Sequence, residues 1–239
     1  MNFLQIAPAV WQLSFPVGHV HVVRLPDGYA LVDTGVPGSA PAVLDALERL
    51  GGRPRDLRQI VLTHSHVDHM GSAADLVAAT GAALVAGALD APFISGTAPE
   101  PQPVFTGPER VLREQVMAGS AEAGMPAAPP VPVDVELYDG GTLDGWAEPV
   151  RVLHVPGHTP GSIALHLPAS GVLFPGDTIA TVGDRAVLGP FNVDRKEAVA
   201  SFRRLAALEV ETVCVPHGQP LTRDAGAVLR AAAPEGDWV

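Results

Sequence analysis

Hydrophobic residues along the chain form short runs that end in turn-forming or polar residues, and this pattern predicts alternating strands and helices. Residues 10–15 (VWQLSF) and 19–25 (HVHVVRL) fit short strands separated by a Pro-Val-Gly turn, and YALVD fits a third strand. The helical period of APAVLDALERL follows and ends at Gly51-Gly52. The buried strand IVLT then leads directly into the polar segment THSHVDH, residues 63–69.

Strands and helices continue to alternate after this polar segment. A helix over residues 71–80 is expected to end at Gly81, and ALVAG fits the next strand. Beyond residue 132 the pattern predicts the strands VELYD, VRVLHV, SIALHL and GVLFPGD, a helix over residues 194–208 that starts with the capping-box spacing DRKE, and a final strand TVCVPHG.

The two halves of the chain share one layout. In the first half a strand ends in Asp-Thr-Gly, a helix follows, and the next strand ends in Thr-His-Ser-His. In the second half the corresponding strand ends are Gly-Asp-Thr and Pro-His-Gly. Two αβ halves whose polar strand ends converge would make one central site.

Residues 90–132 interrupt this order, because they are rich in Pro, Gly and Ala and contain one helical piece around residues 109–118. That length exceeds an ordinary connection, so we expect a functional lid or a partly disordered insert within one domain that spans residues 1–239. An apolar lip over the central site could form from Phe93, Ile94, Phe105, Val116, Met117 and Met125. A dimer contact or simple packing of the insert is the alternative interpretation, and the sequence leaves both open.

The composition narrows the class of partner. The chain has a formal net charge of -11, so it lacks the basic footprint that nucleic acids and anionic membrane surfaces require. Its single cysteine, Cys214, excludes an intramolecular disulfide and fits a reducing compartment. The N-terminus does not resemble a signal peptide, and no apolar run is long enough to span a bilayer. We therefore expect a cytoplasmic protein that acts on a small molecule, as a monomer or a homodimer.

The segment THSHVDH has the residue types and the spacing of a metal site. His64 and His66 are two residues apart, so on an extended segment both imidazoles point to the same side. Asp68 and His69 follow where the chain turns toward a helix, and they can point at a second, adjacent position. One tetrahedral ion cannot take all four groups and further ligands, so the spacing predicts two ions side by side.

Further ligand candidates follow later strands, each beside glycine that allows a close backbone approach. His158 lies in VPGHTPGS, Asp177 in FPGDT, and His217 in VPHGQ. The candidates divide into His64, His66 and His158 for one ion, and Asp68, His69 and His217 for the other, with Asp177 as the bridge.

Other polar residues have ordinary interpretations. We take four histidines as satisfied core or surface residues: His19, His21, His154 and His166. Thr159 and Ser162 could help to hold the His158 loop, but we interpret them as turn residues. Asp33 either caps the turn after its strand or hydrogen-bonds a ligand imidazole from behind, and the sequence leaves both roles open.

In this order, THSHVDH, GHTPGS, GDT and PHG resemble the motifs of the metallo-β-lactamase superfamily, and the resemblance covers essentially the whole chain. It implies an α/β fold, an αββα sandwich of two mixed β-sheets flanked by helices, with a dinuclear site at one edge of the sheets. A bridging carboxylate at Asp177 resembles glyoxalase II and related thioester, lactone or phosphoester hydrolases. The run IATVGDR lacks the Cys-Gly-Arg segment of glyoxalase II, and Ala180 stands where quorum-quenching lactonases of this fold have tyrosine.

The resulting hypothesis is a metal-dependent hydrolase of a small ester, thioester or lactone. Two Zn²⁺ ions are expected, although imidazole and carboxylate ligands also suit iron or manganese. A hydroxide held between the ions would attack the substrate, and Asp68 would orient it and accept its proton. The alternatives are a mononuclear iron persulfide dioxygenase of the same fold and a non-enzymatic binding protein. The complete ligand set argues against a binding protein, because buried polar clusters are costly.

Overall fold

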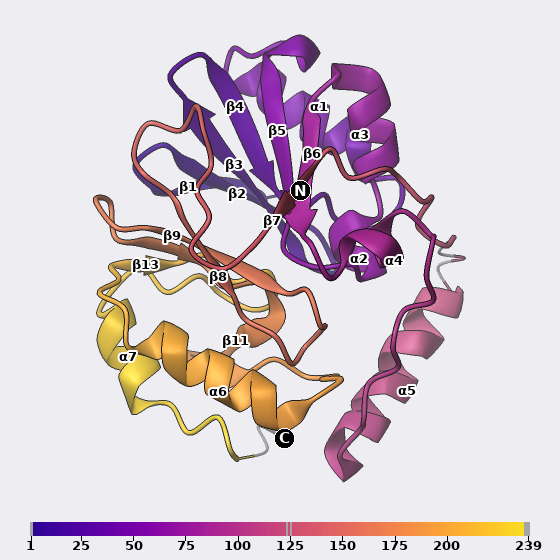
Figure 1. Ribbon diagram of the computed structural model, residues 1–239, viewed down its shortest axis with the longest axis vertical. Coiled ribbons are helices and arrows are strands. Elements are labelled where there is room, and N and C mark those ends of the chain that lie inside the picture. Colours follow the sequence, from indigo (N-terminus) through magenta and orange to yellow (C-terminus); the bar gives the residue numbers. More distant parts are fainter. Residues whose placement is uncertain (1, 123, 125, 237–239) are drawn as a thin grey trace.

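Two β-sheets pack face to face and carry helices on their outer surfaces in this computed structural model (Figure 1). The structure describes residues 2–122, 124 and 126–236. Helices α1 (Ala40–Arg49) and α3 (Ala73–Thr80) cover the first sheet, and α6 (Arg195–Ala206) and α7 (Ala225–Ala231) cover the second. The predicted αββα sandwich is therefore confirmed.

The first sheet contains seven strands in the order of the sequence. The pairings β1–β2, β2–β3 and β3–β4 are antiparallel, whereas β4–β5, β5–β6 and β6–β7 are parallel, so the sheet is mixed. Its strands are β1 (Asn2–Ala7), β2 (Val10–Ser14), β3 (His19–Leu25), β4 (Gly28–Val32), β5 (Leu57–Leu62), β6 (Ala83–Gly87) and β7 (Val135–Leu137).

The second sheet has four strands in the order β13-β10-β9-β8, and a separate hairpin lies beside it. Its only parallel pair joins β10 to β13 among the described residues. The strands are β8 (Arg151–His154), β9 (Ile163–Leu167), β10 (Val172–Phe174) and β13 (Thr212–Val213), and the hairpin pairs β11 (Ile179–Val182) with β12 (Arg185–Leu188).

Three hydrophobic cores separate the four layers, and one strand can serve two of them. In β5, Ile60 and Leu62 pack toward α1 and α3, whereas Val61 packs between the sheets. Because successive side chains point to opposite faces, both faces of this strand are buried. This is why the second half of the strand, residues 60–62 (IVL), reads as an unbroken apolar run rather than an alternating one. The third core lies under α6 and α7.

Short helical pieces connect these layers. Helix α2 (Val67–Met70) follows β5, α4 (Ala91–Ile94) follows β6, and the longer α5 (Gly107–Glu122) lies in the insert. Single 3₁₀ turns, η1 (Pro54–Asp56) and η2 (Gly176–Thr178), precede β5 and β11. Among the described residues, no helix combines the length and the apolar character needed to cross a bilayer.

Most predicted elements lie within a few residues of the observed ones, and the last strand is the main correction. We expected a strand over TVCVPHG, but only Thr212–Val213 are strand residues. Cys214 still donates its backbone N–H to Leu173 O, and Pro216 has no N–H with which to continue the ladder. The sequence analysis also missed the strands β1, β11 and β12 and the helices α2, α4 and α7.

Candidate metal centre

The candidate ligands gather where several strands end on the same side of the sandwich. Because β4 and β5 run parallel, Asp33 and Thr63 come after neighbouring strand ends at one edge. Strands β10 and β13 are also parallel, which brings Asp177 and His217 to the same edge of the second sheet. Residues distant in the sequence therefore meet between the two sheets.

One cluster consists of three imidazoles. His158 Nε2 lies 3.2 Å from His64 Nε2 and 2.9 Å from His66 Nδ1, and these last two nitrogens are 3.1 Å apart. A tetrahedral zinc with bonds of about 2.0–2.1 Å to nitrogen places its ligand atoms about 3.3 Å apart. The three nitrogens thus have close to the spacing of one face of such a site.

A second cluster combines a carboxylate with two imidazoles. Asp68 Oδ2 lies 3.2 Å from His217 Nε2 and 3.6 Å from His69 Nε2. These three residues form a group whose ligand atoms are close enough to hold one ion. His66, Asp68 and His217 are partly exposed, so this side of the site is open to solvent.

Asp177 contacts both clusters. Its Oδ2 lies 3.5 Å from His158 Nε2 and 3.3 Å from His217 Nε2, and its Oδ1 lies 3.4 Å from His69 Nε2. Asp177 comes from the 3₁₀ turn η2 that directly follows β10, where the chain bends into β11. The carboxylate therefore stands in the position expected for a bridging ligand.

Unpartnered polar atoms support a fit to metal ions. His69 Nε2 and Asp177 Oδ1 are buried without a hydrogen-bond partner, which is costly for atoms of this kind. In the three-imidazole cluster one proton can satisfy at most two of the converging nitrogens. A cation at the centre of each cluster would bind the lone pairs that have no hydrogen-bond partner. The donor set of imidazole and carboxylate suits a divalent transition metal.

Asp33 holds two of the ligands from behind. Its carboxylate accepts from His69 Nδ1 at 2.9 Å, and from the backbone N–H and hydroxyl of Thr63. Because the Thr63 hydroxyl proton goes to Asp33, the Thr63 oxygen accepts from His64 Nδ1, which lies 3.0 Å away. Both imidazoles are thus oriented with Nε2 toward the site. Of the two roles left open for Asp33, the structure shows the contact with an imidazole.

The backbone of Asp33 is also unusual. Its φ of 63° lies in the left-handed region, which costs energy for a residue with a side chain and which Asp tolerates better than most. This conformation ends β4 and aims the carboxylate at Thr63 and His69.

The charges in the two clusters differ. Burial, followed by the neighbouring His66, lowers the pKa of His158 to about 3, and burial holds the pKa of His64 well below its ordinary value. Burial also opposes a charge on His217, but Asp177 and Asp68 outweigh it and raise the pKa of His217 to about 10. The first cluster thus offers neutral lone pairs, whereas the second favours a positive charge.

Asp90 is a buried residue of the site that the sequence analysis missed. Its Oδ2 accepts from Ser65 N at 3.0 Å and from Thr159 Oγ1 at 2.7 Å, and its Oδ1 accepts from Gly161 N at 2.6 Å. Asp90 thereby ties the loop of His64 and His66 to the loop of His158. Like Asp33 and Asp177, it closely follows a strand end, and that shared position was the available signal.

The loop around His158 is held at several further points. Thr159 N–H donates to Ser162 Oγ at 3.0 Å, and the Thr159 hydroxyl donates to Asp90, so both side chains help to hold the His158 loop and are more than turn residues. Asp194 caps α6 by accepting from Glu197 N at 3.0 Å, and its own N–H donates to Gly157 O. Gly157 has a φ of 124°, and a Cβ there would lie 2.1 Å from Ala198 N. Only glycine allows the loop to lie this close to α6.

The remaining histidines lie outside the metal centre, as expected, but His21 Nε2 is buried without a hydrogen-bond partner, so the expectation of a satisfied ring is wrong for His21. None of the metal-compatible groups among the described residues includes them. Burial lowers the pKa of His21 to about 3, and its ring lies edge-on to Phe174. The other three have a ring nitrogen within hydrogen-bonding distance of a backbone carbonyl: His19, His154 and His166. Cys214 is a buried core residue.

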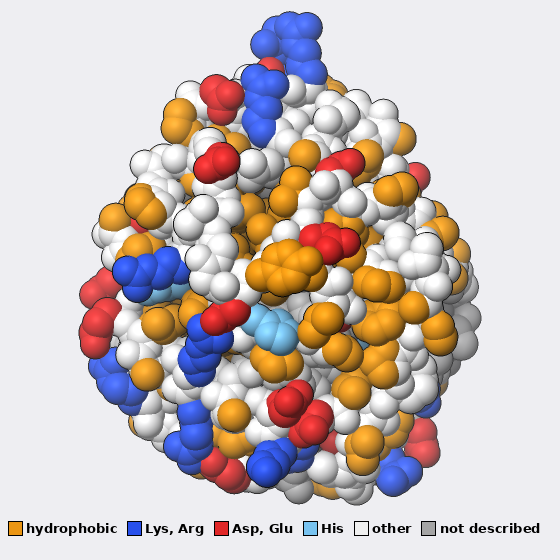
Figure 2. Space-filling model, in the orientation of Figure 1, with side chains coloured by type: hydrophobic (Ala, Val, Ile, Leu, Met, Phe, Trp, Pro, Cys, Tyr) orange, Lys and Arg blue, Asp and Glu red, His pale blue; other side chains and the backbone are white. Residues whose placement is uncertain are grey.

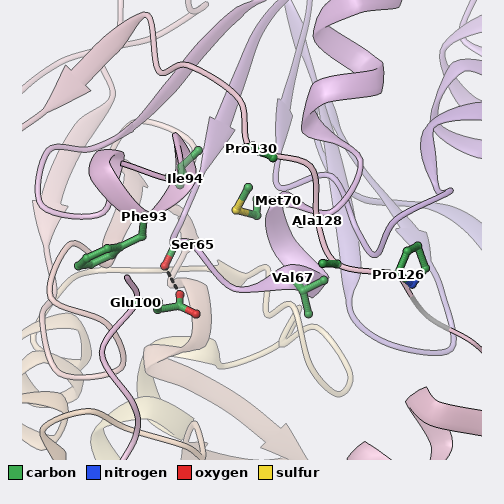
Figure 3. A pocket seen from close by; sticks show the side chains of 11 residues that line it. Ser65, Val67, Met70, Phe93, Ile94, Glu100, Pro126, Ala128 and Pro130 are labelled. Atoms are coloured by element: carbon green, nitrogen blue, oxygen red, sulfur yellow. Dashed lines mark hydrogen bonds between the residues drawn. The ribbon is translucent and has the colours of Figure 1, made fainter. Parts of the chain in front are cut away.

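The insert contributes a pocket beside this centre. It has a volume of about 500 Å³ and is lined by Phe93 and Ile94 from α4, by Val67 and Met70 from α2, and by the chain returning from α5 (Figure 3). The expected lip is thus only partly present. Phe105 packs edge-on against Phe191 instead, and Val116 is exposed. The side chain of Met117 and the whole of Met125 lie outside the described residues.

Comparison with known proteins decides the family. A model of the metallo-β-lactamase superfamily matches residues 14–217, a range that holds the two clusters and Asp33. The chain belongs to the metallo-β-lactamase superfamily. It is a metallohydrolase of this family, with the metal-compatible histidines and aspartates in place.

Individual members of the superfamily resemble the chain over most of its length. YflN of Bacillus subtilis, a probable metallo-hydrolase, is 26% identical over 91% of this chain and 87% of that protein. A hydroxyacylglutathione hydrolase of Cereibacter sphaeroides is 33% identical over 84% of this chain and 67% of that protein. The solved structure of the metallo-β-lactamase MIM-1 from Novosphingobium pentaromativorans matches with a TM-score of 0.71 at 23% identity, over 97% of this chain and 86% of that one. This last likeness concerns the fold alone.

Proposed function

We propose that the chain is a dinuclear zinc hydrolase that cleaves a small ester, thioester or lactone. The observation that carries the proposal is the pair of three-residue clusters joined by one carboxylate, Asp177. The first ion would be held by His64, His66 and His158, and the second by Asp68, His69 and His217. The similarity to a hydroxyacylglutathione hydrolase, whose name describes a thioester substrate, supports this substrate class.

Two bound divalent cations would supply a hydroxide at neutral pH and polarise the substrate's carbonyl oxygen. Asp68 is the candidate base, because its side chain is partly exposed and its Oδ2 lies 3.2 Å from His217 Nε2 in the second cluster. The carboxylate would orient the attacking oxygen by accepting its proton in a hydrogen bond. Asp33 and Thr63 would keep the ligand imidazoles in one tautomer throughout the reaction.

The fixed geometry of the site supports this chemistry. His64, His69 and His158 are buried, and each loop that carries them is hydrogen-bonded to a second loop through Asp33 or Asp90. Preorganised ligands need little rearrangement when charge develops in the transition state. We also propose that the protein acts in the cytoplasm, a location that fits its single cysteine.

A substrate panel tests the proposal. The zinc-loaded protein is assayed with thioesters, aryl esters and lactones of short acids, and Asp177→Ala is measured in parallel. Metal-dependent hydrolysis of at least one class, lost in Asp177→Ala, is the expected result. Oxygen uptake with a persulfide in place of hydrolysis would contradict the proposal and favour the iron dioxygenase.

A further inference from the structure

The pocket beside the metal centre is apolar on most of its wall. Val67 and Met70 face Phe93 and Ile94 across it, and Pro126 and Pro130 close a third side (Figure 3). Its volume of about 500 Å³ lies within the range of small-molecule sites, about 300–1,000 Å³. Such a wall favours a hydrocarbon group over a polar one, because apolar surface leaves water on binding.

This pocket adjoins the metal centre at Glu100, whose Oε1 lies 3.8 Å from Nε2 of the candidate ligand His66. Ser65 and Val67, which line it, are the immediate sequence neighbours of the candidate ligand His66. The chain that forms the far wall belongs to the insert over residues 90–132, so the cavity lies between the ligand loop and this insert. A substrate that reached from the ions past His66 would enter the pocket at Glu100.

One charged residue lines the pocket, and it is acidic. Glu100 accepts a hydrogen bond from Ser65 Oγ, and its Oε1 lies 3.8 Å from His66 Nε2. The lining contains no Lys, Arg or His that could pair with an anion. On the face shown in Figure 2, a histidine reaches the surface among hydrophobic side chains and acidic groups.

We propose that this pocket binds the acyl group of an uncharged, apolar substrate, and that Glu100 selects against acyl groups that end in a carboxylate. The inference rests on the proposed hydrolase function and narrows its substrate class. A hydrocarbon chain meets an apolar wall there, whereas a terminal carboxylate would lose its hydration and face Glu100 without a cationic partner.

Three thioesters of one neutral thiol, N-acetylcysteamine, test the apolar part of the proposal. The acyl groups are acetyl, hexanoyl and adipoyl, of which the last two have equal carbon number and differ by the terminal carboxylate. Since each buried methylene favours binding by about fourfold, we expect hexanoyl to exceed acetyl at least tenfold in kcat/KM. Equal values for hexanoyl and acetyl would overturn the proposal.

A bulky substitution within the pocket sharpens this test. Ala127 lines the pocket and is exposed, so a tryptophan there occupies the cavity without entering the core. Ala127→Trp should lower the hexanoyl-to-acetyl ratio of kcat/KM about tenfold or more. Ala147→Trp, at an exposed alanine outside the pocket, is the matched control and should keep the wild-type ratio. An unchanged ratio in both variants would place the acyl chain elsewhere.

The role of Glu100 has its own readout. The wild type should prefer hexanoyl to adipoyl at least tenfold, and Glu100→Gln should reduce that ratio about tenfold, because it removes the like charge. Glu114→Gln neutralises an exposed carboxylate on α5 and should leave the ratio unchanged. If Glu100→Gln keeps the full preference for hexanoyl over adipoyl, Glu100 does not cause the selectivity.

A binding measurement separates this inference from the proposed function. The neutral fluorescent probe N-phenyl-1-naphthylamine is titrated into the protein as purified, with Ala127→Trp and Ala147→Trp in parallel. We expect binding in the wild type and in Ala147→Trp, and at least tenfold weaker binding in Ala127→Trp. If no thioester is hydrolysed but this pattern holds, the hydrolase proposal fails and the apolar pocket stands. Equal binding in both variants would overturn the pocket whatever the activity.

Discussion

The metal centre and the insert over residues 90–132 are built in opposite ways. At the centre, Asp33 and Asp90 each accept several hydrogen bonds from loops that carry candidate ligands, and both are almost fully buried. In the insert, α5 leaves most of its described side chains exposed and lies along the outside of the molecule (Figure 1).

The insert is nevertheless attached at defined points. The buried carboxylate of Glu109 accepts from Thr106 N at 2.7 Å and from Phe191 N at 3.0 Å, and the ring of Phe105 packs edge-on against Phe191. The comparison teaches that many buried contacts fix the ligand positions, whereas only a few contacts attach the insert that forms the pocket wall. Substitutions should therefore affect chemistry in the first region and selectivity in the second.

The largest effect is expected at the ligands that the two clusters share or depend on. Asp177→Ala and His66→Ala should each remove most of the bound metal and lower activity about a thousandfold or more, because metal chemistry supplies the nucleophile. Elemental analysis and kcat/KM on the same preparations measure this. Asp184→Ala, at an exposed aspartate in the β11–β12 turn, is the matched control. Full metal content in both ligand variants would show that the assignment is wrong.

A smaller effect, on zinc affinity, is expected at Asp33, which hydrogen-bonds the ligand His69 from behind. Asp33→Asn places an amide where His69 Nδ1 and Thr63 donate to a carboxylate. The loss of this orienting acceptor should weaken zinc binding ten- to a hundredfold. Zinc titration against a competing chelator measures the change, and the exposed Asp45→Asn serves as control. Wild-type zinc affinity in Asp33→Asn would mean that the hydrogen bond does not orient His69.

A loss of stability is expected at the junction of the loops. Asp90→Ala leaves the donors of Ser65, Thr159 and Gly161 without their acceptor. Each unsatisfied buried group costs about 1–3 kcal/mol, so the free energy of unfolding should fall by at least about that amount. Urea titration of the metal-loaded protein measures it. Asp90→Asn keeps an acceptor oxygen and should lose less; equal losses would contradict this explanation.

The smallest effect is expected on the outer surface of the insert. Val111 on α5 is 56% exposed, and surface substitutions of this kind usually change stability by less than about 0.5 kcal/mol. Val111→Ser should therefore keep the wild-type free energy of unfolding and metal content. A larger loss of stability would show that this face of α5 is covered in solution. Sedimentation analysis would then test whether a homodimer covers it.

The sequence predicted the fold, and it predicted which polar side chains the fold brings together, for a physical reason. Buried strands that end in polar residues reveal both the sheet and its functional edge, so His64, Asp177 and His217 could be identified from their positions alone. Asp90 could not, because its role depends on contacts with Thr159 and Gly161, about seventy residues away. In the sequence alone, Asp90 is simply the first residue of the insert.

The lip was predicted less well, since composition shows that a segment is apolar but not which way its side chains point. Phe93 lines the pocket, whereas Phe105 turns toward Phe191. Glu100 was missed for the same reason: only the fold brings it against Ser65 and near His66.

The metal content per chain tests the central claim most directly. Untagged protein is purified without chelator, and zinc, iron and manganese are measured by elemental analysis alongside protein concentration. The two clusters joined by Asp177 predict about two zinc ions per chain. About one iron per chain with little zinc would contradict the dinuclear hydrolase and direct the next experiment to oxygen uptake with a persulfide.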